Sequence, residues 1–459
     1  MSVSEANTSM TSVERRSVLT LCLLYITRML GLFMVLPVFA IYLAGYEGFT
    51  LTMLGYALGV YGLTQALMQL PFGLISDKLG RKPVIIFGLL IFCLGSVVAA
   101  LADSMTGVII GRALQGAGAI ASTIMALVAD VTRDESRSKA MAMIGASIGL
   151  SFALAMVLGP KISAAYGLQG VFWLTAAMAV LGILLVLFAV PTPKGNELSD
   201  ALPAISMIKR VLADKQLLRY DFGIFCLHMA LTASFVVVPN LLETTLLLSP
   251  ENHGFTYLLV LGGAFVMMLP AMIIAEKKYK LKAAFLGAIT VMIVGAAIVA
   301  MAYDNAMFFI AAWFVFFVGF NLLEALLPSM LSRQVFPGGK GTAMGIYSSC
   351  QFMGIAVGGA VGGLLASQYG PEGVFAFVVG VLVVWLLWAM SMVPPIKSKT
   401  LILKYHARFN ASDIAAEIRA VLGVIDVIVM DEDMVAYVKV KAGEFDPASL
   451  HVFSSKVAV

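Results

Sequence analysis

A ten-residue stretch separates two long apolar runs, roughly Leu51–Ile75 and Val84–Leu101, and it reads Gly73-Leu74-Ile75-Ser76-Asp77-Lys78-Leu79-Gly80-Arg81-Lys82. It gathers one acid, three bases and two glycines in a chain that is otherwise poor in charge. So short a connection between apolar helices must turn tightly, which favours glycine where φ is positive. The stretch therefore predicts a charged turn between two membrane-spanning helices. The alternative is a basic loop that only sets the orientation of the chain.

The composition is that of a membrane protein. Of the 459 residues, 61% are hydrophobic and 12% are charged, whereas about 25% of the residues in soluble domains are charged. The net charge of +4 is small and dispersed, which gives no support for a nucleic-acid partner. The cysteines lie in apolar runs without paired spacing, so we expect buried small hydrophobes and neither disulfides nor metal ligands at Cys22, Cys93, Cys226 and Cys350.

Twelve apolar runs are long enough to span a bilayer, since about 20 helical residues cross its hydrocarbon. Arg15-Arg16 before the first run resembles a signal peptide, but the run is too long and no small-residue cleavage site ends it. The first half is predicted to span at Ser17–Leu43, Leu51–Ile75, Val84–Leu101, Met105–Val128, Ala140–Ala164 and Val171–Val190. The second half is predicted to span at Arg219–Leu242, Gly254–Ala275, Ala283–Met301, Ala306–Leu331, Ala343–Ala366 and Val374–Val393.

The loop charges predict the orientation. The loops after spans 2, 4, 6, 8 and 10 carry lysine and arginine, whereas the loops after the odd-numbered spans carry only acids such as Glu47, Asp103 and Asp304. Because cytoplasmic loops are enriched in Lys and Arg, both termini are predicted to be cytoplasmic in a bacterial inner membrane.

The two halves repeat each other. Residues 70–78, LPFGLISDK, align without gaps on residues 269–277, LPAMIIAEK, with the same spacing from proline to acid. A parallel six-plus-six repeat is a common layout of secondary transporters. The predicted domains are a cytoplasmic tail 1–16, a six-helix half 17–190, a linker 191–218, a second six-helix half 219–395 and a soluble domain 396–459.

Three motifs resemble those of the major facilitator superfamily of secondary transporters. The spacing G-x-(L/I)-x-D-(K/R)-x-G-R-K at residues 73–82 resembles the loop between helices 2 and 3. Val108-x-x-x-Arg112-x-x-Gln115-Gly116-x-Gly118-Ala119 resembles a helix 4 motif tied to proton coupling. The Gly159-Pro160 pair resembles a helix 5 motif of proton-coupled antiporters, although alanine and serine replace its other glycines. The expected fold is an all-α membrane protein with twelve helices in two halves.

The resemblance implies a role for each motif. An ion-pair cluster would latch the two halves together when the cavity faces outward, with residues Gly73, Asp77, Gly80, Arg81, Lys82 and Asp130. Asp77 is also placed to approach the positive N-terminus of span 11, and the alternative is a solvated charge pair that contributes little. Gly159 and Pro160 would weaken span 5 locally and hinge it.

Polar residues in the membrane are costly and usually face a cavity. The candidates for proton coupling are Arg28, Arg112, Gln115, His228, Asn321 and Glu324, and the candidates for cavity lining are Tyr61, Gln65 and Gln69. Glu324 is interpreted as the only acid deep in the second half. The structural alternatives are a carbonyl-capping role for Arg28, a core histidine at position 228, and packing for the tyrosine and glutamines.

The last segment changes character after Pro394-Pro395. Its pattern predicts a strand at Leu401–Tyr405, a helix up to Leu422, a hairpin of Val424–Met430 and Met434–Lys441 around an acidic turn, and a second helix from Asp446 to Phe453. This order predicts a small ferredoxin-like α+β domain that lacks its final strand. The absence of cysteine argues against a copper site, and regulation of the membrane domain is the hypothesis for its role.

These features predict a proton-coupled secondary transporter, an exporter of small amphipathic or drug-like compounds that works by rocker-switch alternating access. The alternatives are a proton symporter or importer, and a non-transporting sensor that signals through the last domain. No Ser-His-Asp or metal-ligand constellation indicates an enzyme. The expected partners are the small-molecule substrate, protons and the lipid bilayer, with the proton gradient in place of a cofactor and a monomeric chain.

Overall fold

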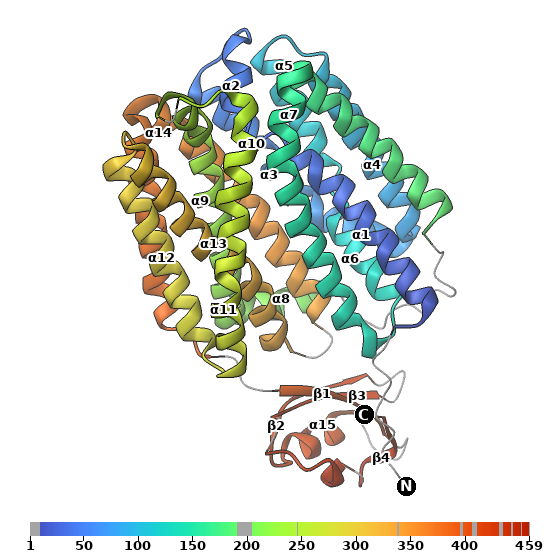
Figure 1. The fold of residues 1–459 in the computed structure, drawn as a ribbon. Coiled ribbons are helices and arrows are strands. Elements are labelled where there is room, and N and C mark those ends of the chain that lie inside the picture. The colour runs from blue at the N-terminus through green and yellow to red at the C-terminus, as the bar shows by residue number, and fades with distance from the viewer. Residues whose placement is uncertain are drawn as a thin grey trace.

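The computed structural model describes residues 10–190, 204–245, 247–336, 339–394, 398–405, 411–430, 435–441, 444–450 and 452–458. In Figure 1 a bundle of long helices stands beside a small sheet domain. The first half of the bundle contains α1 (Ser12–Phe33), α2 (Phe39–Tyr42), α3 (Leu51–Leu79), α4 (Arg81–Ala100), α5 (Met105–Ala117), α6 (Ala121–Asp130) and α7 (Asp134–Phe188). The second half contains α8 (Ala204–Ala213), α9 (Lys215–Thr245), α10 (His253–Tyr257), α11 (Gly263–Lys277), α12 (Leu281–Ala302), α13 (Ala306–Gln334) and α14 (Lys340–Met390).

The number of crossings agrees with the sequence prediction. Ten helices among the described residues are long and apolar enough to span a membrane. Two of them, α7 with 55 residues and α14 with 51, bend at Gly167 and Gly370, where φ is +66° and +64°. A straight helix of that length would measure roughly 80 Å, far more than the hydrocarbon of a bilayer. Each therefore crosses twice, and ten helices make twelve crossings.

Spans 1 and 4 are interrupted, although the hydropathy predicted continuous helices. α1 ends at Phe33 and the chain passes through turns to α2, because Pro37 cannot donate a backbone hydrogen bond. α5 ends at Ala117, and α6 begins only at Ala121. A Cβ atom at Gly118 would lie 2.3 Å from the carbonyl oxygen of Gly88. Because glycine has no side chain there, the interrupted part of span 4 packs directly against the backbone of α4.

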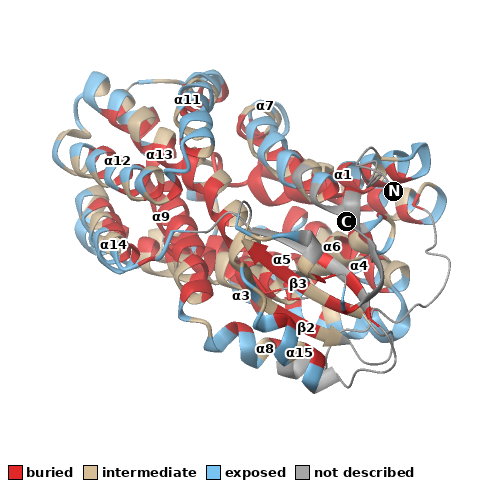
Figure 2. Cartoon of the chain, turned by 90° about the horizontal axis from the view of Figure 1, so that it is seen from below, coloured by how far each residue is buried: buried red, intermediate tan, exposed pale blue. Residues whose placement is uncertain are grey.

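The outer surface of the bundle is apolar. Exposed large hydrophobic side chains cover the outer faces of α4 and α11, such as Phe87, Leu90, Leu94, Phe265 and Val266. Figure 2 shows this exposed rim around a buried interior. Such a surface is stable only against lipid chains, in agreement with the membrane-spanning assignment.

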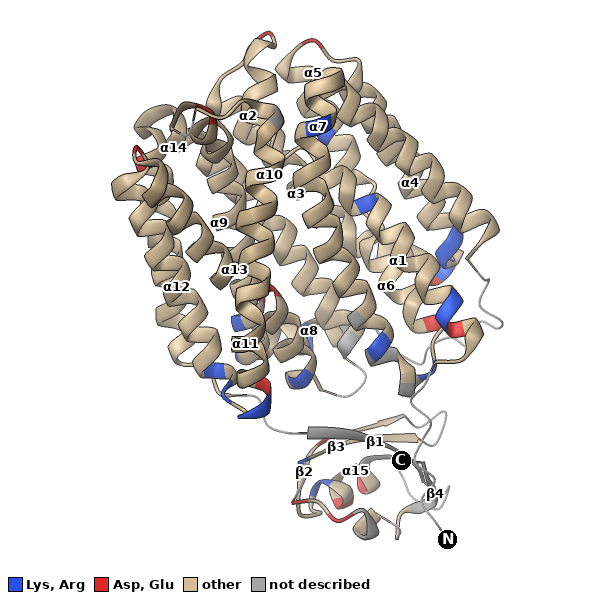
Figure 3. Ribbon diagram, viewed as in Figure 1, with Lys and Arg blue, Asp and Glu red and all other residues tan. Residues whose placement is uncertain are grey.

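Most charged residues of the bundle lie at its two ends, and only a few lie between them (Figure 3). We call the end beside the sheet domain the basic end, because it carries Arg81, Arg133, Lys277 and Arg333 at helix termini. The opposite end is the acidic end, whose turns carry Glu47, Asp103, Asp304 and Glu372.

Glycines let α14 pack closely on two neighbours. On one face, Cβ atoms at Gly354, Gly358 and Gly362 would lie 2.2–2.8 Å from the backbone of α9. On another face, Gly359 and Gly363 meet Gly55 and its neighbours in α3. Small residues permit such close backbone approach in membranes. α14 is thus held between its own half and the first half.

The two halves pack against each other toward the acidic end. Thr52 near the start of α3 is hydrogen-bonded to Ser367 of α14 at 3.0 Å, and Gly254 of α10 lies against Val157 of α7. Toward the basic end, by contrast, added Cβ atoms at Gly145 and Gly149 of α7 and at Gly341 and Gly345 of α14 would meet nothing within 4 Å. The contacts between the halves are therefore concentrated at the acidic end.

The sheet domain corrects one sequence prediction. It contains β1 (Ser398–Tyr405), α15 (Ala411–Arg419), β2 (Val424–Met430), β3 (Val435–Lys441), a 3₁₀ turn (Pro447–Leu450) and β4 (Ser454–Ala458). The antiparallel order β2-β3-β1-β4 is that of a ferredoxin-like sheet. The final strand, predicted to be missing, is present and pairs with β1, while the predicted second helix is only the 3₁₀ turn. Residues 431–434, with the predicted acidic turn, lie outside the described residues.

The reason for this error is local. β4 has five residues, SSKVA, and lies at the edge of the sheet, so its hydrophobic pattern is too short to be distinguished from a loop. The preceding segment contains Pro447, which starts a helical turn easily, but only a few residues remain before the strand begins.

The sheet domain is docked on the basic end of the bundle. Lys439 Nζ of β3 donates to the carbonyl oxygens of Arg333, Gln334 and Val335 at 2.7, 3.0 and 3.1 Å, and Ile428 packs into the hydrophobic core of the bundle. The last carbonyls of a helix lack partners within it and attract cations, so Lys439 caps the C-terminus of α13.

A second contact lies beside this cap. Arg210 of α8 pairs with Asp426 of β2 at 2.8 Å and stacks on Phe336 at 4.1 Å. An open cavity of about 470 Å³ lies between these residues and the end of α13. α8 belongs to the predicted linker, so the linker joins the bundle to the domain.

We expect Lys439→Met to loosen this docking, because hydrogen bonds from a charged group are worth about 1.5–3 kcal/mol. Spin labels on Leu422→Cys and Leu212→Cys, both at exposed positions, would report the change as a broader distance distribution. Lys441→Met is the matched control, since Lys441 pairs with Glu444 inside the domain. Equal distributions in both variants would show that the cap does not hold the domain.

Candidate functional site

The charged turn has the geometry that its glycines predict. Gly80 joins α3 to α4 with φ at +89°, a value that other residues rarely adopt. Arg81 begins α4 and pairs with Asp77 one turn back in α3. Its Nε donates to Asp130 at the end of α6 at 2.9 Å, and Nη1 donates to Ser76 at 2.7 Å. The turn thus ties three helices of the first half together.

The predicted latch between the halves is not closed in this conformation. Asp77 is 55% exposed, and its only hydrogen bond or ion pair among the described residues is to Arg81. Gly73 faces Ser122 of α6, and Lys82 is half-buried. The members of the cluster therefore meet within the first half, and their role as a latch remains a prediction.

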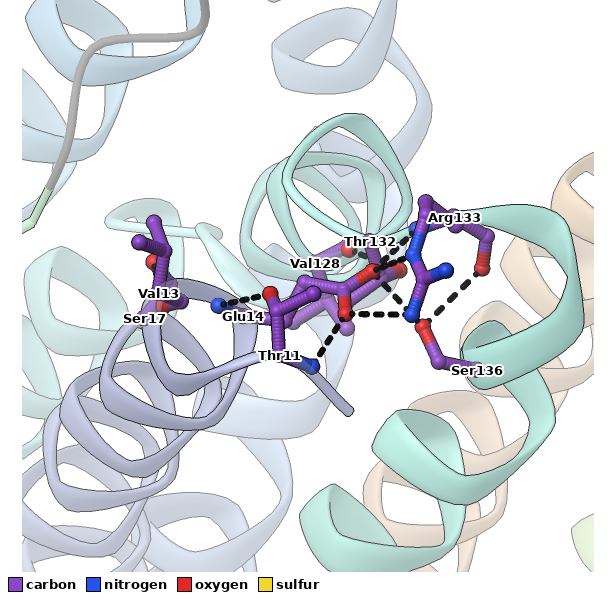
Figure 4. A network of polar contacts seen from close by, with 8 residues as sticks. All are labelled: Thr11, Val13, Glu14, Ser17, Val128, Thr132, Arg133 and Ser136. Carbon is purple, nitrogen blue, oxygen red and sulfur yellow. Dashed lines mark hydrogen bonds and ion pairs between the residues drawn. The ribbon is translucent and has the colours of Figure 1, made fainter. Parts of the chain in front are cut away.

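A second ionic cluster lies at the same end and has no counterpart in the sequence predictions. Glu14, 6% exposed, accepts hydrogen bonds from the backbone and guanidinium of Arg133 at 2.8–3.1 Å and from Ser136 at 2.9 Å (Figure 4). It also closes a capping box with Thr11. The Thr11-x-x-Glu14 spacing before an apolar run is the signal that could have revealed it. This cluster holds the start of α1 against the α6–α7 turn.

We expect Glu14→Gln to lower the stability of the folded protein by about 2 kcal/mol, because the ion pair with Arg133 is lost and the amide NH₂ group cannot accept the hydrogen bonds that a carboxylate oxygen accepts. Thermal unfolding in detergent would measure the loss. Glu47→Gln, an exposed acid at the opposite end, is the control and should leave the unfolding temperature unchanged. An equal effect of both variants would contradict a stabilising role for the cluster.

Arg28 is buried in the first half and contacts three other helical segments. It donates to the hydroxyl of Tyr61 and to Oε1 of Gln65 at 2.8 Å, both on α3. It also reaches the carbonyl oxygens of Gln115 and Gly118, each at 3.4 Å, where span 4 is interrupted. This geometry supports the carbonyl-capping alternative for Arg28.

The polar residues of α3 belong to the same cluster. Gln65 Nε2 donates to Gln69 Oε1 at 3.3 Å, one turn along α3. Tyr61, Gln65 and Gln69 are each at most 1% exposed. In this conformation Gln65 and Gln69 are hydrogen-bonded within the first half, whereas the ring of Tyr61 also contacts Phe352 of α14 at 6.4 Å. Their role in cavity lining remains a prediction.

Arg112 and Gln115 act together, as their helical spacing predicts. Arg112 Nη1 donates to Gln115 Oε1 at 2.7 Å, and Gln115 Nε2 donates to Ser96 of α4 at 2.8 Å. The guanidinium of Arg112 also lies over the ring of Tyr61 at 4.5 Å. The helix 4 motif thus holds a buried cation in place with neutral partners.

Neither buried arginine has an acidic partner among the described residues. Arg28 stacks on Phe92 at 4.0 Å, and its other partners are hydroxyl, amide and carbonyl oxygens. The partners of Arg112 are likewise carbonyl and amide oxygens and an aromatic ring. Within the described part of the first half, the interior therefore carries positive charge without an acidic partner. Burying such charge is costly, and ionisable groups inside a membrane are usually functional.

The second half carries the complementary groups. His228 of α9 lies 3.9 Å from a carboxylate oxygen of Glu324 of α13, and Gln351 Nε2 of α14 lies 2.8 Å from His228 Nε2. In this amide orientation the ring nitrogen accepts the hydrogen bond. The side chain of Glu324 is 34% exposed, yet its Oε2 atom is buried without a hydrogen-bond partner. Three helices thus bring a histidine and an acid together in mid-membrane.

Asn321 is hydrogen-bonded to a different segment. Its Nδ2 lies 3.5 Å from the carbonyl oxygen of Leu261, in the π-helical turn Leu258–Gly262 between α10 and α11. A π-helical turn leaves carbonyls poorly paired and often marks functional positions. Asn321 therefore joins α13 to the turn before α11, and no hydrogen bond among the described residues joins it to Glu324.

The structure corrects the interpretation of Glu324 as the only acid deep in the second half. Asp221, in the second turn of α9, is 3% exposed, and neither of its carboxylate oxygens has a hydrogen-bond partner among the described residues. The sequence places it close to the start of the predicted span, where an acid normally faces the headgroups. In the structure, the packing of α14 against α9 buries Asp221 instead.

The two sets of groups face each other across the contact between the halves. Arg112 and His228 line one small pocket of about 10 Å³, together with apolar residues of both halves. A row of rings also crosses the contact: Phe33 to Phe152 at 5.1 Å, Phe152 to Phe320 at 6.4 Å, and Phe320 to His228 at 6.1 Å. The centre of the bundle is therefore aromatic, with a cation on one side and protonatable groups on the other.

The proposed hinge is a point of close packing. α7 is continuous through Gly159 and Pro160, and its bend lies at Gly167. A Cβ atom at Gly159 would lie 2.5 Å from the carbonyl oxygen of Met34 and 3.2 Å from Pro37. The glycine lets α7 contact the interruption of span 1, and hinge motion at this position remains a prediction.

The model of the Major Facilitator Superfamily matches residues 21–221 and 220–422. The chain belongs to this superfamily. It is 41% identical over 434 residues to the inner membrane transport protein YajR of Escherichia coli, covering 94% of this chain and 95% of YajR. It is 25% identical over 340 residues to the multidrug resistance protein MdtH of Aeromonas salmonicida, covering 72% of this chain and 82% of MdtH.

Solved transporters share the fold. A bacterial homologue of the human lysosomal transporter Spinster, in an inward-facing and occupied conformation, superposes with a TM-score of 0.68 at 14% identity, over 83% of this chain and 96% of that one. The nucleoside transporter NupG gives 0.63 at 14% identity, over 83% and 99%. Identities this low establish the fold alone. The chain is thus a multi-pass membrane transporter of the YajR and MdtH type.

Proposed function

We propose that this superfamily member is a proton-driven exporter of small amphipathic or drug-like compounds in the bacterial inner membrane. The observation that carries the proposal is the electrostatic asymmetry of the two halves. Two buried arginines, neither with an acidic partner among the described residues, lie in the first half, and Glu324 with His228 lies across the contact in the second. Proton binding changes the charge on one side only, and so it changes the attraction between the halves.

The orientation follows from the charges at the ends. Lys and Arg are enriched in cytoplasmic loops, so the basic end with the sheet domain is assigned to the cytoplasm. The halves contact each other toward the acidic end, which is then the periplasmic end. The described conformation is accordingly assigned as inward-facing, in agreement with the exposure of Asp77 and with the open latch.

A transport cycle follows from these assignments. An ionised Glu324 is attracted toward the positive interior of the first half, and a proton that reaches it from the periplasm removes this attraction. The substrate leaves for the periplasm and the proton enters from it. Both steps shift the equilibrium between the inward-facing and outward-facing conformations. Each ligand can shift the balance only through its different affinity for the two conformations.

The nature of the substrate rests on the rings at the centre. Phe33, Phe152 and Phe320 offer flat apolar surfaces beside one polar pair, an arrangement that suits amphipathic compounds with few specific hydrogen bonds. The name of MdtH, a multidrug resistance protein, supports this class. A sensor is the second candidate, favoured by the docking of the sheet domain on α13, the helix that carries Glu324.

Transport into proteoliposomes with an imposed pH gradient tests the proposal. A panel of fluorescent amphipathic compounds, ethidium among them, would be compared with and without the gradient, while a pH dye reports proton movement. Substrate movement opposite to the proton movement is expected for an exporter. Movement in the same direction would indicate a symporter, and binding without any flux would indicate a sensor.

A further inference from the structure

The cavity of about 470 Å³ between the sheet domain and the basic end of the bundle has no part in the proposed transport cycle. Its lining residues come from α8, the end of α13, β2 and β3. The cavity is therefore complete only while the domain is docked on the bundle. Its volume lies in the range of small-molecule sites, which measure about 300–1,000 Å³.

The two acids that line the cavity already have partners. Oδ2 of Asp426 accepts a hydrogen bond from Arg210 at 2.8 Å, and its Oδ1 accepts one from the backbone amide of Val427 at 2.9 Å. Oδ1 of Asp214 accepts from two backbone amides in the first turn of α9, at 2.7 and 3.3 Å, and so caps that helix. Both carboxylates are thus engaged locally, one by a guanidinium and one by a helix N-terminus.

Three cations line the cavity, and two of them keep unused hydrogen-bond donors. Arg210 uses only Nη2, for Asp426. Arg333 likewise uses only Nη2, for both carboxylate oxygens of Glu276 at 2.7 and 2.8 Å. Nε and Nη1 of the two arginines have no hydrogen-bond acceptor among the described residues, and the side chains are 41% and 33% exposed. Lys439 adds a third positive charge, although it donates to the carbonyls at the end of α13.

These donors match the chemistry of a phosphate group. The planar fork of a guanidinium binds phosphate oxygens in pairs, and two such groups from separate helices line one cavity. Beside them lies an apolar wall, formed by Phe336, on whose ring Arg210 stacks at 4.1 Å, and by Ile425 of β2, which is 42% exposed. An anion that also carries a ring suits this combination better than inorganic phosphate.

We propose that this cavity binds an organic phosphate of about the size of a mononucleotide, with the phosphate held by Arg210 and Arg333 and the ring against the apolar wall. Because bundle and domain both contribute to the site, the ligand favours the docked arrangement by linkage. It thereby strengthens the contact of the domain with α13, the helix that carries Glu324. The headgroup of an anionic phospholipid offers the same phosphate chemistry, and the experiment separates the two sources.

Isothermal titration calorimetry of the full chain in a non-ionic detergent tests the site. The probes are adenosine monophosphate, ribose 5-phosphate and adenosine, which lacks the phosphate. Adenosine monophosphate is expected to bind more tightly than ribose 5-phosphate, and adenosine is expected not to bind. Arg333→Gln should weaken the binding of adenosine monophosphate by about 10- to 100-fold. Arg16→Gln, which replaces an exposed arginine of the first half, is the matched control and should leave the affinity unchanged.

Glu276→Gln distinguishes a binding role of Arg333 from a structural one. The carboxylate of Glu276 competes with a bound anion for the guanidinium of Arg333. Its removal should therefore tighten the binding of adenosine monophosphate several-fold. If the pair only shaped the end of α13, both Arg333→Gln and Glu276→Gln would weaken binding, and that result would overturn the proposal.

Spin labels on Leu422→Cys and Leu212→Cys separate a soluble ligand from a lipid. Narrowing of the distance distribution that requires adenosine monophosphate would assign the site to a soluble phosphate. Narrowing in phosphatidylglycerol nanodiscs without the nucleotide, absent from phosphatidylcholine nanodiscs and from Arg333→Gln, would assign it to the lipid headgroup. The proposal is refuted if no probe binds and neither condition narrows the distribution, or if Arg333→Gln binds as the wild type does. Neither readout involves flux, so both are independent of the transport proposal.

Discussion

Glu324→Gln is expected to abolish transport driven by a pH gradient, while the protein still inserts, folds and binds substrate. Glutamine keeps the size and hydrogen-bonding capacity of a protonated glutamate, but it cannot release a proton. The second half would then be fixed in its neutral form, and the attraction toward Arg28 and Arg112 could not be switched on and off. Proteoliposomes loaded with a pH dye measure the result directly, because neither substrate nor protons should move when the gradient is imposed.

Two controls give this result its meaning. Glu243→Gln removes an exposed carboxylate from the neighbouring α9 and should transport like the wild type. Exchange of labelled for unlabelled substrate without a gradient should persist in Glu324→Gln, since substrate exchange needs no net proton transfer. Gradient-driven transport at the wild-type rate would mean that Glu324 does not couple protons, and a loss of exchange as well would point to a defect in substrate binding.

Gly359→Val is expected to prevent the halves from closing at the acidic end. A Cβ atom at this position would lie 2.6 Å from the carbonyl oxygen of Gly55 and 2.7 Å from the amide nitrogen of Gly59. Overpacking of this kind costs about 1–3 kcal/mol, which shifts the balance between conformations by roughly 5- to 150-fold. Transport should fall accordingly, because one half of the alternating cycle becomes unfavourable.

Cross-linking reports the shift independently of transport. Thr52 and Ser367 form a hydrogen bond at 3.0 Å near this contact, so the pair Thr52→Cys and Ser367→Cys should form a disulfide under mild oxidation. Adding Gly359→Val should suppress it. Gly345→Val on the same helix is the control, because a Cβ atom there meets nothing within 4 Å. Equal cross-linking in both variants would show that the glycine contact does not decide closure.

The predicted candidate site was only partly visible in the sequence. The spacing of Arg112 and Gln115 predicted that they share a helix face, and the structure has them in contact. Nothing in the local pattern indicated that Arg28 would join Tyr61, Gln65 and the interruption of span 4, because these residues are 33 to 90 positions apart. Asp221 was missed because an acid near a helix start normally faces the headgroups, and only the packing of α14 buries it.

The sequence by itself determined the twelve crossings, the separation of charge between the two ends and the glycine turn at position 80. These are local properties, since hydropathy over 20 residues, loop charge and backbone conformation depend on neighbours in the chain. Only the tertiary structure decided which helices meet, and with them the glycine contacts of α14, the docking of Lys439 on α13, the edge strand β4 and the pairing of a positively charged half with a protonatable one across a row of aromatic rings. Those features depend on contacts between distant segments, and the energy of a buried polar group is set by the partners that such contacts bring or withhold.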